Sequence, residues 1–574
     1  MPPLYEPLDA ALREELKEYD DLTAALLARR GVLSAEDAET FLNPSYDEHL
    51  FDPMQMLDMP RAAMRFARAI TEGEHVAVWS DYDCDGIPGG VVLHDFLKKC
   101  GADFENYIPH RHLEGYGVNI PGIEKLAARG TRLVVTVDSG ITDVAAIARA
   151  KELGMDVIVT DHHLPQETLP DAYAVVNPNA RRNEVYPFKG LCGAALAWKL
   201  ALAALEVEPS LRERVPLGWE KWLLDMVGLA TIADMVPIRG ENRVLARYGL
   251  VVLRKSPRIG LQKLCRAMRV EQSALTEDDV GFMLAPRVNA ASRMGEAWDA
   301  FHLFITEDEG EADMLAKKLE KLNRERRAKA GAITRAVHAR LHGNAPKDVI
   351  VLGDPDWKPA LLGLVANGIA EEFGRPTFLW GREGSGLLKG SCRAAGHTHV
   401  VELMQAANGA FIEFGGHAQS GGFSVKDDEV FSLDEKLNAA YARLHASTGA
   451  EETASGAQKA DAELALRDAT LDFLRKLERL APFGQENDKP LFYVRQVSVL
   501  RVMRFGKGEE HLKIRFGQED TSVEVEGVAF FAKRALGRHA EMLSDGDRVN
   551  VLAHLERDQF SRGNPLRLRL ISLL

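Results

Sequence analysis

The sequence predicts an α/β fold built in two lobes, followed by a small β-barrel. Three short apolar runs, at residues 76–79, 133–137 and 157–160, are each followed by a helix-like stretch. Alternation of this kind is typical of parallel sheets. A long helical pattern over 309–341 interrupts the rhythm, and the strand-helix alternation then restarts and runs over 348–445. We therefore expect two lobes with parallel sheets, joined by one long helix.

The joining helix is predicted from its apolar stripe. Apolar residues recur near helical spacing among many lysines and arginines, at Leu315, Leu319, Leu322, Ile333, Val337 and Leu341. Residues 446–462 are rich in Ser, Thr and Gly and read as a linker. From Pro490 onward, about five short strands with polar turns suggest an OB-fold barrel.

Bulk composition limits the class of protein. A chain of 574 residues is too long for one hydrophobic core. We find no apolar run long enough to cross a bilayer, no signal peptide, and no metal-type spacing among the five cysteines, which together predict a cytoplasmic protein. The net charge of −14 argues mildly against a non-specific duplex binder, but a carboxylate-rich metal site would also contribute negative charge.

Acidic residues follow each of the three apolar runs. Asp81, Asp83 and Asp85 alternate after the first, Asp138 follows the second, and Asp161 follows the third. In open α/β sheets the functional site lies at the carboxyl ends of the strands. The alternative is that these are ordinary helix-capping turns with solvated carboxylates, since Asp is common there.

Histidines and a fourth acidic segment favour a metal site over capping turns. His162 and His163 stand in tandem after Asp161, whereas a lone histidine is more often structural. Asp234 lies inside an apolar stretch, where an unpaired carboxylate is costly. A site rich in oxygen ligands, without thiolates, suits two Mn²⁺ or Mg²⁺ ions in the arrangement used for phosphoryl displacement.

Taken in order, these motifs resemble the DHH phosphoesterase superfamily, with a DHH lobe and a DHHA1 lobe. Further segments are similar to the RecJ family within it: 108–111, 115–117, 191–195, 286–293, 389–393, 414–418, 482–484 and 511–513. One departure is Ile87-Pro88-Gly89-Gly90, where the family usually has small hydroxyl residues.

The resemblance implies roles for individual residues. The implied metal ligands are Asp83, Asp85, Asp138, His162 and Asp234. His163 would act near the scissile phosphate as an acid or electrostatic helper, with Asp161 and Asp81 orienting ligands or a water. Phosphates along the strand would be bound by Asn289, Arg293, Ser391, Arg393 and His417. Arg111 and Tyr116 would read the 5′ end.

The resemblance also implies a domain plan and an activity. The expected parts are an N-terminal helical segment (1–45), a DHH domain (46–305), a connecting helix (306–342), a DHHA1 domain (343–450), and a linker with an OB-fold (451–574). The implied activity is 5′→3′ exonuclease action on single-stranded DNA to mononucleotides, in recombination and repair, with single-strand-binding protein and a helicase as partners.

Two other functions stay open on the sequence. A DHH phosphatase or nanoRNase acting on short oligonucleotides or small phosphoesters would share the metal site but would not need the barrel. Basic residues of the barrel suggest a surface that follows a strand: Arg501, Arg504, Lys507, Lys513, Arg515, Arg562, Arg567 and Arg569. A non-catalytic scaffold would have lost ligand positions, whereas every one here holds a carboxylate or an imidazole.

Overall fold

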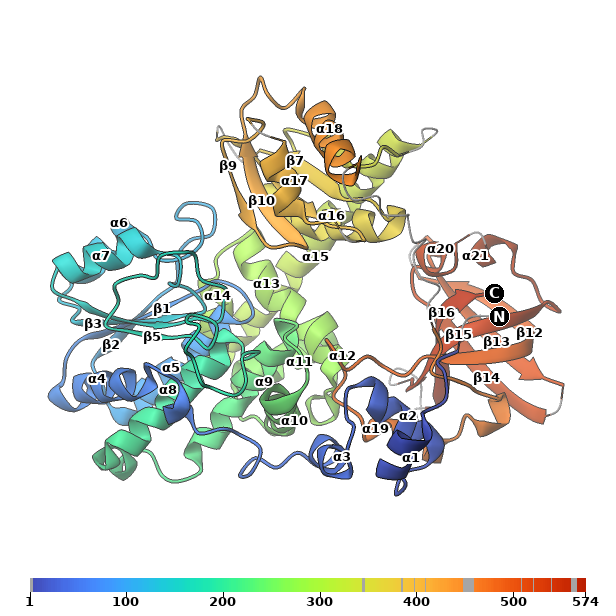
Figure 1. The fold of residues 1–574 in the computed structure, drawn as a ribbon, viewed down its shortest axis with the longest axis horizontal. Coiled ribbons are helices and arrows are strands. Elements are labelled where there is room, and N and C mark those ends of the chain that lie inside the picture. The colour runs from blue at the N-terminus through green and yellow to red at the C-terminus, as the bar shows by residue number, and fades with distance from the viewer. Residues whose placement is uncertain are drawn as a thin grey trace. The chain divides into compact units, whose positions relative to one another are not determined.

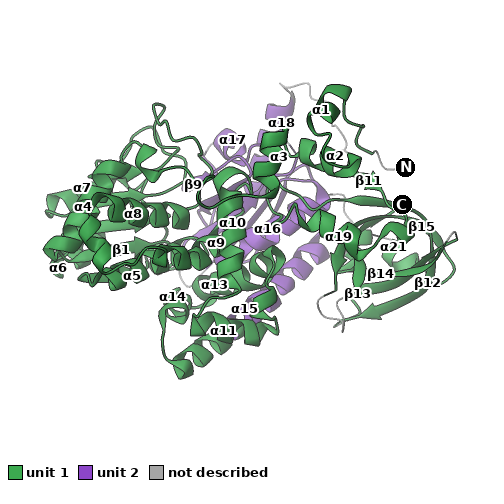
Figure 2. Ribbon diagram, turned by 90° about the horizontal axis from the view of Figure 1, so that it is seen from below, with its two compact units in different colours: residues 1–320, 459–574 green, residues 321–458 purple. Residues whose placement is uncertain are grey.

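The computed structural model divides the chain into two compact units, residues 1–320 with 459–574 and residues 321–458 (Figure 2). The structure describes residues 4–342, 346–382, 386–396, 398–407, 409–446, 459–506, 508–519, 521–537, 539–558 and 565–574. The linker residues 447–458, Lys507 and Arg562 lie outside these ranges. Among the described helices, none is long and apolar enough to span a membrane.

The first unit contains a fully parallel five-stranded sheet in the order β2-β1-β3-β4-β5, which confirms the expected sheet. Its strands are β1 (Val76–Ser80), β2 (Phe104–Tyr107), β3 (Leu133–Val137), β4 (Asp156–Thr160) and β5 (Ala174–Val176). β1 and β3 are buried along their whole length, as expected for strands covered on both faces. Because β1, β3 and β4 run parallel, their carboxyl ends meet at one edge.

Helices cover both faces of this sheet (Figure 1). One face carries α4 (Met59–Glu72), α5 (Gly86–Cys100) and α8 (Gly193–Val207), and the other α6 (Ile120–Ala128) and α7 (Val144–Glu152). Trp79 of β1 packs with Ile123 and Ile147 in the core under α6 and α7. The hydrophobic sheet therefore fixes the strand ends that carry the acidic residues.

The chain between this sheet and the joining helix is mostly helical, with a π-helical turn at Val280–Leu284. Its helices are α9 (Leu224–Ala233), α10 (Gly240–Leu253), α11 (Ile259–Met268), α12 (Glu277–Asp279), α13 (Ala285–Met294) and α14 (Trp298–Ile305). Pro286 follows the π turn and has no N–H to continue the α-helical ladder, which accounts for the irregularity. The predicted joining helix is confirmed as α15 (Glu309–Leu341).

The second unit holds a mixed sheet in the order β6-β7-β8-β10-β9. Its elements are β6 (Ile350–Gly353), β7 (Thr377–Gly381), β8 (Leu388–Arg393), β9 (Glu413–Gly416), β10 (Ser420–Val425), α16 (Pro359–Phe373), α17 (Val400–Ala406) and α18 (Leu433–Ala446). β6 and β7 pair in parallel, as expected, but the other three pairings are antiparallel. The connection at 382–387 is too short for the crossover that a parallel β7–β8 pair would need.

The C-terminal strands form the expected barrel. β12 (Phe492–Phe505), β13 (His511–Gln518), β14 (Thr521–Ala529), β16 (Leu566–Leu573) and β15 (Arg548–Arg557) pair in that order, and β12 with β15 closes the ring. Short elements flank it: β11 (Ala462–Glu463), α19 (Leu471–Glu478), α20 (Ala532–Leu536) and α21 (His539–Met542). Closure leaves the five barrel strands without a free edge.

The N-terminal helices share one hydrophobic core with the barrel. They are α1 (Ala10–Glu15), α2 (Asp21–Arg29) and α3 (Ala35–Leu42), and their Leu27 and Phe41 belong to the same cluster as Phe492. Buried Arg243 of α10 donates to the carbonyls of Phe41 at 2.5 Å and Leu480 at 2.8 Å. Burial lowers the pKa of Arg243 to about 9. The segment expected as a separate part is therefore packed against the barrel.

Candidate metal centre

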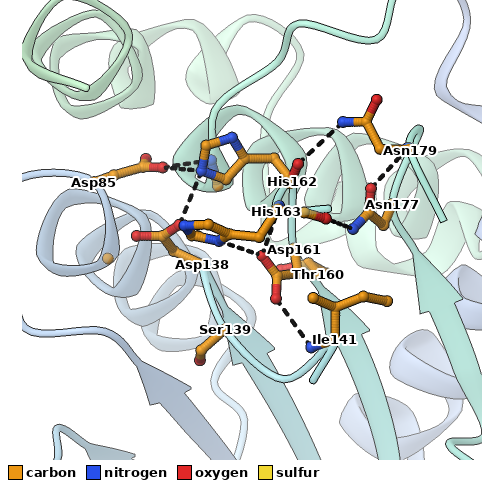
Figure 3. A network of polar contacts seen from close by, with 12 residues as sticks. Asp85, Asp138, Ser139, Ile141, Thr160, Asp161, His162, His163, Asn177 and Asn179 are labelled. Atoms are coloured by element: carbon orange, nitrogen blue, oxygen red, sulfur yellow. Dashed lines mark hydrogen bonds and ion pairs between the residues drawn. The ribbon is translucent and has the colours of Figure 1, made fainter. Parts of the chain in front are cut away.

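The carboxyl ends of the parallel strands bring imidazoles and carboxylates together (Figure 3). His162 Nε2 lies 3.1 Å from Asp138 Oδ1 and 3.6 Å from Asp85 Oδ2. Asp234, at the C-terminal end of α9, places its Oδ2 3.6 Å from the same nitrogen. Residues far apart in sequence thus converge at one point on the sheet edge.

Asp138 has an unusual backbone that aims its side chain into this cluster. Its φ is 60°, in the left-handed region that most residues avoid, and Asp tolerates this better than larger side chains. Its N–H donates to the carbonyl of Thr160 at 3.0 Å, so the turn is fixed to the neighbouring strand. Strained backbone of this kind often marks a functional site.

Asp85 is held by the amino end of α8. Gly193 and Ala194 donate their N–H groups to its two carboxylate oxygens at 2.6 and 2.8 Å. A helix amino end carries partial positive charge and stabilises the anion. Gly193 also approaches closely, because a Cβ there would lie 2.6 Å from the Cβ of Asp138. Asp83 is fixed in turn by the N–H of Asp85, which donates to its Oδ1 at 2.8 Å.

The cluster holds more negative charge than its own cations balance. Burial, and then repulsion from neighbouring carboxylates, raises the pKa of Asp81, Asp138 and Asp234, and that of Asp234 reaches about 9. Burial likewise raises the pKa of Asp85. Asp81 Oδ1 is buried and accepts no hydrogen bond within the described residues, and the 3.1 Å contact between Asp138 Oδ1 and His162 Nε2 lacks hydrogen-bond geometry. A bound cation would remove both costs.

The donor set fits two hard divalent ions. Three groups have ligand atoms within 4.8 Å of one another: Asp138 with His162 and His163, Asp85 with His162 and Asp234, and Asp81 with Asp83 and Asp138. Asp138 and His162 each belong to two groups, as a site with shared ligands would require. The nearby thiols of Cys84 and Cys192 are buried, and burial raises the pKa of both, so neither offers a thiolate. Carboxylates and imidazole without thiolate suit Mn²⁺ or Mg²⁺.

His163 forms a charged pair with Asp161. Its Nδ1 lies 2.8 Å from Asp161 Oδ1, while the N–H of Ile141 donates to Asp161 Oδ2 at 3.0 Å (Figure 3). Burial opposes protonation of His163, but the hydrogen bond and charge of Asp161 raise its pKa to about 9. Burial alone would raise the pKa of Asp161, yet its hydrogen bonds to His163 and Ile141 lower it. The pairing with Asp161 therefore fixes the ring of His163 and favours its protonated form.

Two asparagines that the sequence did not single out hold the histidine turn. Asn177 Nδ2 donates to the carbonyl of His163 at 2.9 Å, and Asn179 Nδ2 donates to that of His162 at 3.0 Å. Figure 3 shows both amides directed at the histidine backbone. Both asparagines follow β5, so they could have been found from the sequence as polar residues directly after a further apolar strand.

The predicted substrate residues of the first unit lie around this centre. The Tyr116 hydroxyl donates to the carbonyl of Asp138 at 3.2 Å and lies 3.3 Å from His163 Nδ1. Asn289 Oδ1 accepts the N–H of Cys84 at 2.9 Å, so this side chain also supports the acidic turn. Arg293 is one helical turn from Asn289 on α13. The guanidinium carbon of Arg111 lies 4.7 Å from the ring centre of Tyr82.

The remaining predicted substrate residues share one end of the second unit's sheet. Arg393 ends β8 and pairs with Ser420, the first residue of β10. His417 lies in the turn between β9 and β10, and its N–H donates to the carbonyl of Ser420 at 2.8 Å. Ser391 is two residues before Arg393, on the same side of the strand. The second unit therefore gathers Ser391, Arg393 and His417 at one end of its sheet.

The basic face expected on the barrel is partly neutralised. Lys513 pairs with Glu526 at 2.6 Å, and Arg515 with Glu524 at 3.5 Å. Arg567 contacts Glu556 and Asp558, with N–O distances of 2.7 and 2.8 Å. Positive charge available to a nucleic acid is therefore smaller than the residue count suggests.

Fold and site together define a DHH-type metal-dependent phosphoesterase. Profiles described as "DHH family, N-terminal domain", "DHHA1 domain" and "RecJ OB domain" match residues 75–231, 346–446 and 460–572. The expected order of a DHH lobe, a DHHA1 lobe and an OB domain is confirmed by these matches.

The chain belongs to the RecJ family. It is 34% identical over 553 residues to a Bacillus subtilis protein named single-stranded-DNA-specific exonuclease RecJ, covering 96% of this chain and 67% of that protein. The namesake from Escherichia coli is 30% identical, covering 91% and 92%. The solved RecJ from Thermus thermophilus in complex with Mn²⁺ superposes with a TM-score of 0.78 at 27% identity, covering 100% of this chain and 78% of that one. A second crystal structure of the same enzyme contains Mg²⁺, which agrees with the ions expected here.

Proposed function

We propose that this protein is a 5′→3′ exonuclease that degrades single-stranded DNA to mononucleotides with Mn²⁺ or Mg²⁺, in recombination and repair. The observation that carries the proposal is the convergence of Asp85, Asp138, His162 and Asp234 at one sheet edge. Relatives that align over most of this chain are named single-stranded-DNA-specific exonucleases.

The five proposed metal ligands are Asp83, Asp85, Asp138, His162 and Asp234. When bound, the ions would neutralise charge on the phosphate. They would also lower the pKa of a bound water, so that it could lose a proton and attack the phosphate as hydroxide. Gly193 and Ala194 orient Asp85 through their N–H groups, and Asp138 is oriented by its fixed turn. Asp81 adds a carboxylate beside Asp83, where it orients a ligand or a water.

His163 stabilises negative charge as the phosphodiester bond breaks, or donates its proton to the leaving oxygen. Its pairing with Asp161 supports this role, because it fixes the ring and favours the protonated imidazole. Arg111 and Tyr116 read the 5′ end. Phosphates further along the strand are bound by Asn289, Arg293, Ser391, Arg393 and His417, for which arginine offers a two-pronged donor.

The domain division that accompanies this function is the one expected from the sequence: 1–45, 46–305, 306–342, 343–450 and 451–574. The barrel binds the part of the single-stranded DNA that lies further from the metal centre. Single-strand-binding protein and a helicase supply the substrate, and the protein acts in the cytoplasm.

Digestion of end-labelled DNA tests the proposal. With Mn²⁺ or Mg²⁺, 5′-labelled single strands should release labelled mononucleotide at once, whereas 3′-labelled strands should shorten stepwise. Chelator should abolish both reactions. Labelled mononucleotide appearing first from the 3′ end, or equal digestion of blunt duplex, would contradict the proposal. Activity confined to short oligonucleotides would favour the small-substrate phosphatase instead.

A further inference from the structure

Tyr82 lies inside the acidic turn, between Asp81 and Asp83, and the proposed chemistry does not use its side chain. It is only 7% exposed, so an ordinary core role is the simplest interpretation. Its neighbours argue otherwise. The Arg111 guanidinium lies over its ring at 4.7 Å, and the ring of Tyr116 meets it edge-to-face, with centroids 6.4 Å apart at 78°.

Arg111 and Tyr116 belong to a segment, residues 108–119, that contains no helix or strand. Its ends are fixed by carboxylates: Glu114 accepts the N–H of His110 at 2.7 Å, and Asp143 accepts that of Val118 at 2.7 Å. Between these anchors, Gly115 and Gly117 have φ values of 86° and 81°. Such backbone does not by itself fix the two side chains, so they depend on what they pack against.

Tyr82 connects this segment to the reacting centre. Tyr116, which contacts Tyr82, also donates to the carbonyl of Asp138 and lies 3.3 Å from His163. Two of the residues proposed to bind DNA, Arg111 and Tyr116, therefore contact one ring, whose backbone neighbours are carboxylates of the metal centre.

We propose that Tyr82 is a positioning residue that sets the distance between the 5′-terminal phosphate and the metal centre. Its ring supports Arg111 by a cation–π contact and Tyr116 by an edge-to-face contact. Because Tyr82 is part of the acidic turn, it connects the two 5′-reading side chains of the 108–119 segment to the metal ligands. This inference rests on the proposed 5′-end role of Arg111 and Tyr116. It accounts for the proposed release of one nucleotide in each cycle.

The test compares Tyr82→Leu with Tyr82→Phe, which keeps the ring. The matched control is Tyr173→Leu, since Tyr173 lies under Arg61 at 4.8 Å but precedes β5, at the opposite edge of the sheet. KM, kcat and product length are measured on single strands with a 5′-phosphate and with a 5′-hydroxyl. Manganese affinity is measured by calorimetry and folding by thermal denaturation.

Tyr82→Leu is expected to raise KM for 5′-phosphorylated strands about 2- to 30-fold, the range that a cation–π contact supplies. It should also release dinucleotides beside mononucleotides, with kcat and manganese affinity nearly unchanged. Tyr82→Phe should restore KM and product length, and Tyr173→Leu should alter neither. In the Arg111→Gln background, Tyr82→Leu should raise KM by a smaller factor, because only its contact with Tyr116 is then left to lose.

Mononucleotide products with an unchanged KM from Tyr82→Leu would overturn the role of Tyr82. So would a loss of activity that merely follows a loss of stability or of manganese affinity, because that is the behaviour of a core residue. Wild-type digestion from the 3′ end would overturn the proposed function together with this inference. If the wild-type protein digests from the 5′ end and Tyr82→Leu has the same KM and the same products, this inference is overturned and the proposed function stands.

Discussion

The left-handed backbone of Asp138 makes one substitution especially informative. Asparagine has the same shape and tolerates this conformation, so Asp138→Asn should keep the turn while removing the charge. We expect activity to fall more than about a hundredfold, beyond the effect of losing an outer partner of a metal ligand. Thermal stability in chelator should not fall, because burial and the neighbouring carboxylates already disfavour the ionised form of Asp138.

The control for this variant is Asp156→Asn, at the amino end of β4, where Asp156 pairs with Arg65 at 2.6 Å. It changes the same functional group at the opposite edge of the sheet and should leave activity intact. Normal turnover by Asp138→Asn would remove Asp138 from the proposed ligands.

Asp143 gives a residue-level prediction about pH. Burial, and then the charge of Asp161, raises its pKa from 3.8 to about 6. Between these values the folded protein holds a proton that the unfolded chain releases, so the free energy of unfolding falls as pH rises through this window. Asp143→Asn cannot ionise and avoids that loss. Its stability advantage over wild type should therefore grow by about 1 kcal/mol between pH 5 and pH 8.

Urea denaturation of both proteins at the two pH values, in chelator, measures this difference. Titration of the metal ligands affects wild type and variant alike and cancels in the comparison. A stability difference that stays constant with pH would show that Asp143 ionises normally.

At the residue scale, the sequence predicted which side chains converge where they follow directly after a strand. Asp85, Asp138 and His162 were each predictable, because parallel strand ends must meet. The hydrogen bond from the N–H of Cys84 to Asn289 could not be predicted, because the two residues are 205 positions apart in the sequence. Tyr82 was hidden for another reason: an aromatic side chain beside a strand is usually part of the core.

Among the secondary-structure elements, α8 has the most direct effect on the metal centre. Gly193→Ala would place a Cβ 2.6 Å from that of Asp138 and 3.0 Å from Asp85 Oδ2. Because neither carboxylate can move without leaving the cluster, we expect manganese affinity to fall about 10–100-fold, comparable to losing a partner that orients a ligand. Calorimetric titration with Mn²⁺ measures this.

The control is Gly331→Ala within α15, where the nearest atom to a new Cβ is the Arg335 guanidinium at 3.5 Å. Alanine favours helix over glycine, so this variant should be slightly more stable and bind Mn²⁺ normally. Equal affinity in both variants would mean that the α8 terminus is free to shift.

Element types followed from periodicity, but two details did not. The apolar runs and the stripe over 309–341 predicted β1, β3, β4 and α15. The antiparallel pairings of β8 and β10 depend on connection length and partner choice, which alternation does not encode. The π turn before α13 could not be predicted from periodicity either, because it depends on how Pro286 interrupts the hydrogen bonds of a helix that has formed.

At the scale of the whole molecule, the shared core of the N-terminal helices and the barrel gives a prediction. Leu27→Ala empties a fully buried position in that core and should lower stability by about 2–5 kcal/mol. It should weaken binding of long single strands, which also use the barrel, while hydrolysis of short oligonucleotides stays normal. Leu126→Ala is the matched control, since it is equally buried under the catalytic sheet.

Affinities for a long and a short oligonucleotide, measured for both variants, decide the matter. Leu126→Ala should impair hydrolysis of both substrates, because it loosens the sheet that carries the ligands. Loss of short-substrate hydrolysis in Leu27→Ala alone would mean that the N-terminal helices stabilise the catalytic lobe instead of the barrel.

The shared core also has a consequence for biosynthesis. Leu16, Leu27 and Phe41 can join the barrel part of their core only when the segment from Leu464 onward has been translated. Residues 43–463 take roughly 20–80 s to synthesise at about 5–20 residues per second. During that interval the emerging amphipathic helices expose apolar faces beside a catalytic lobe that can already fold. A chaperone that holds nascent chains is therefore expected to occupy residues 10–42 until the ribosome has finished the barrel.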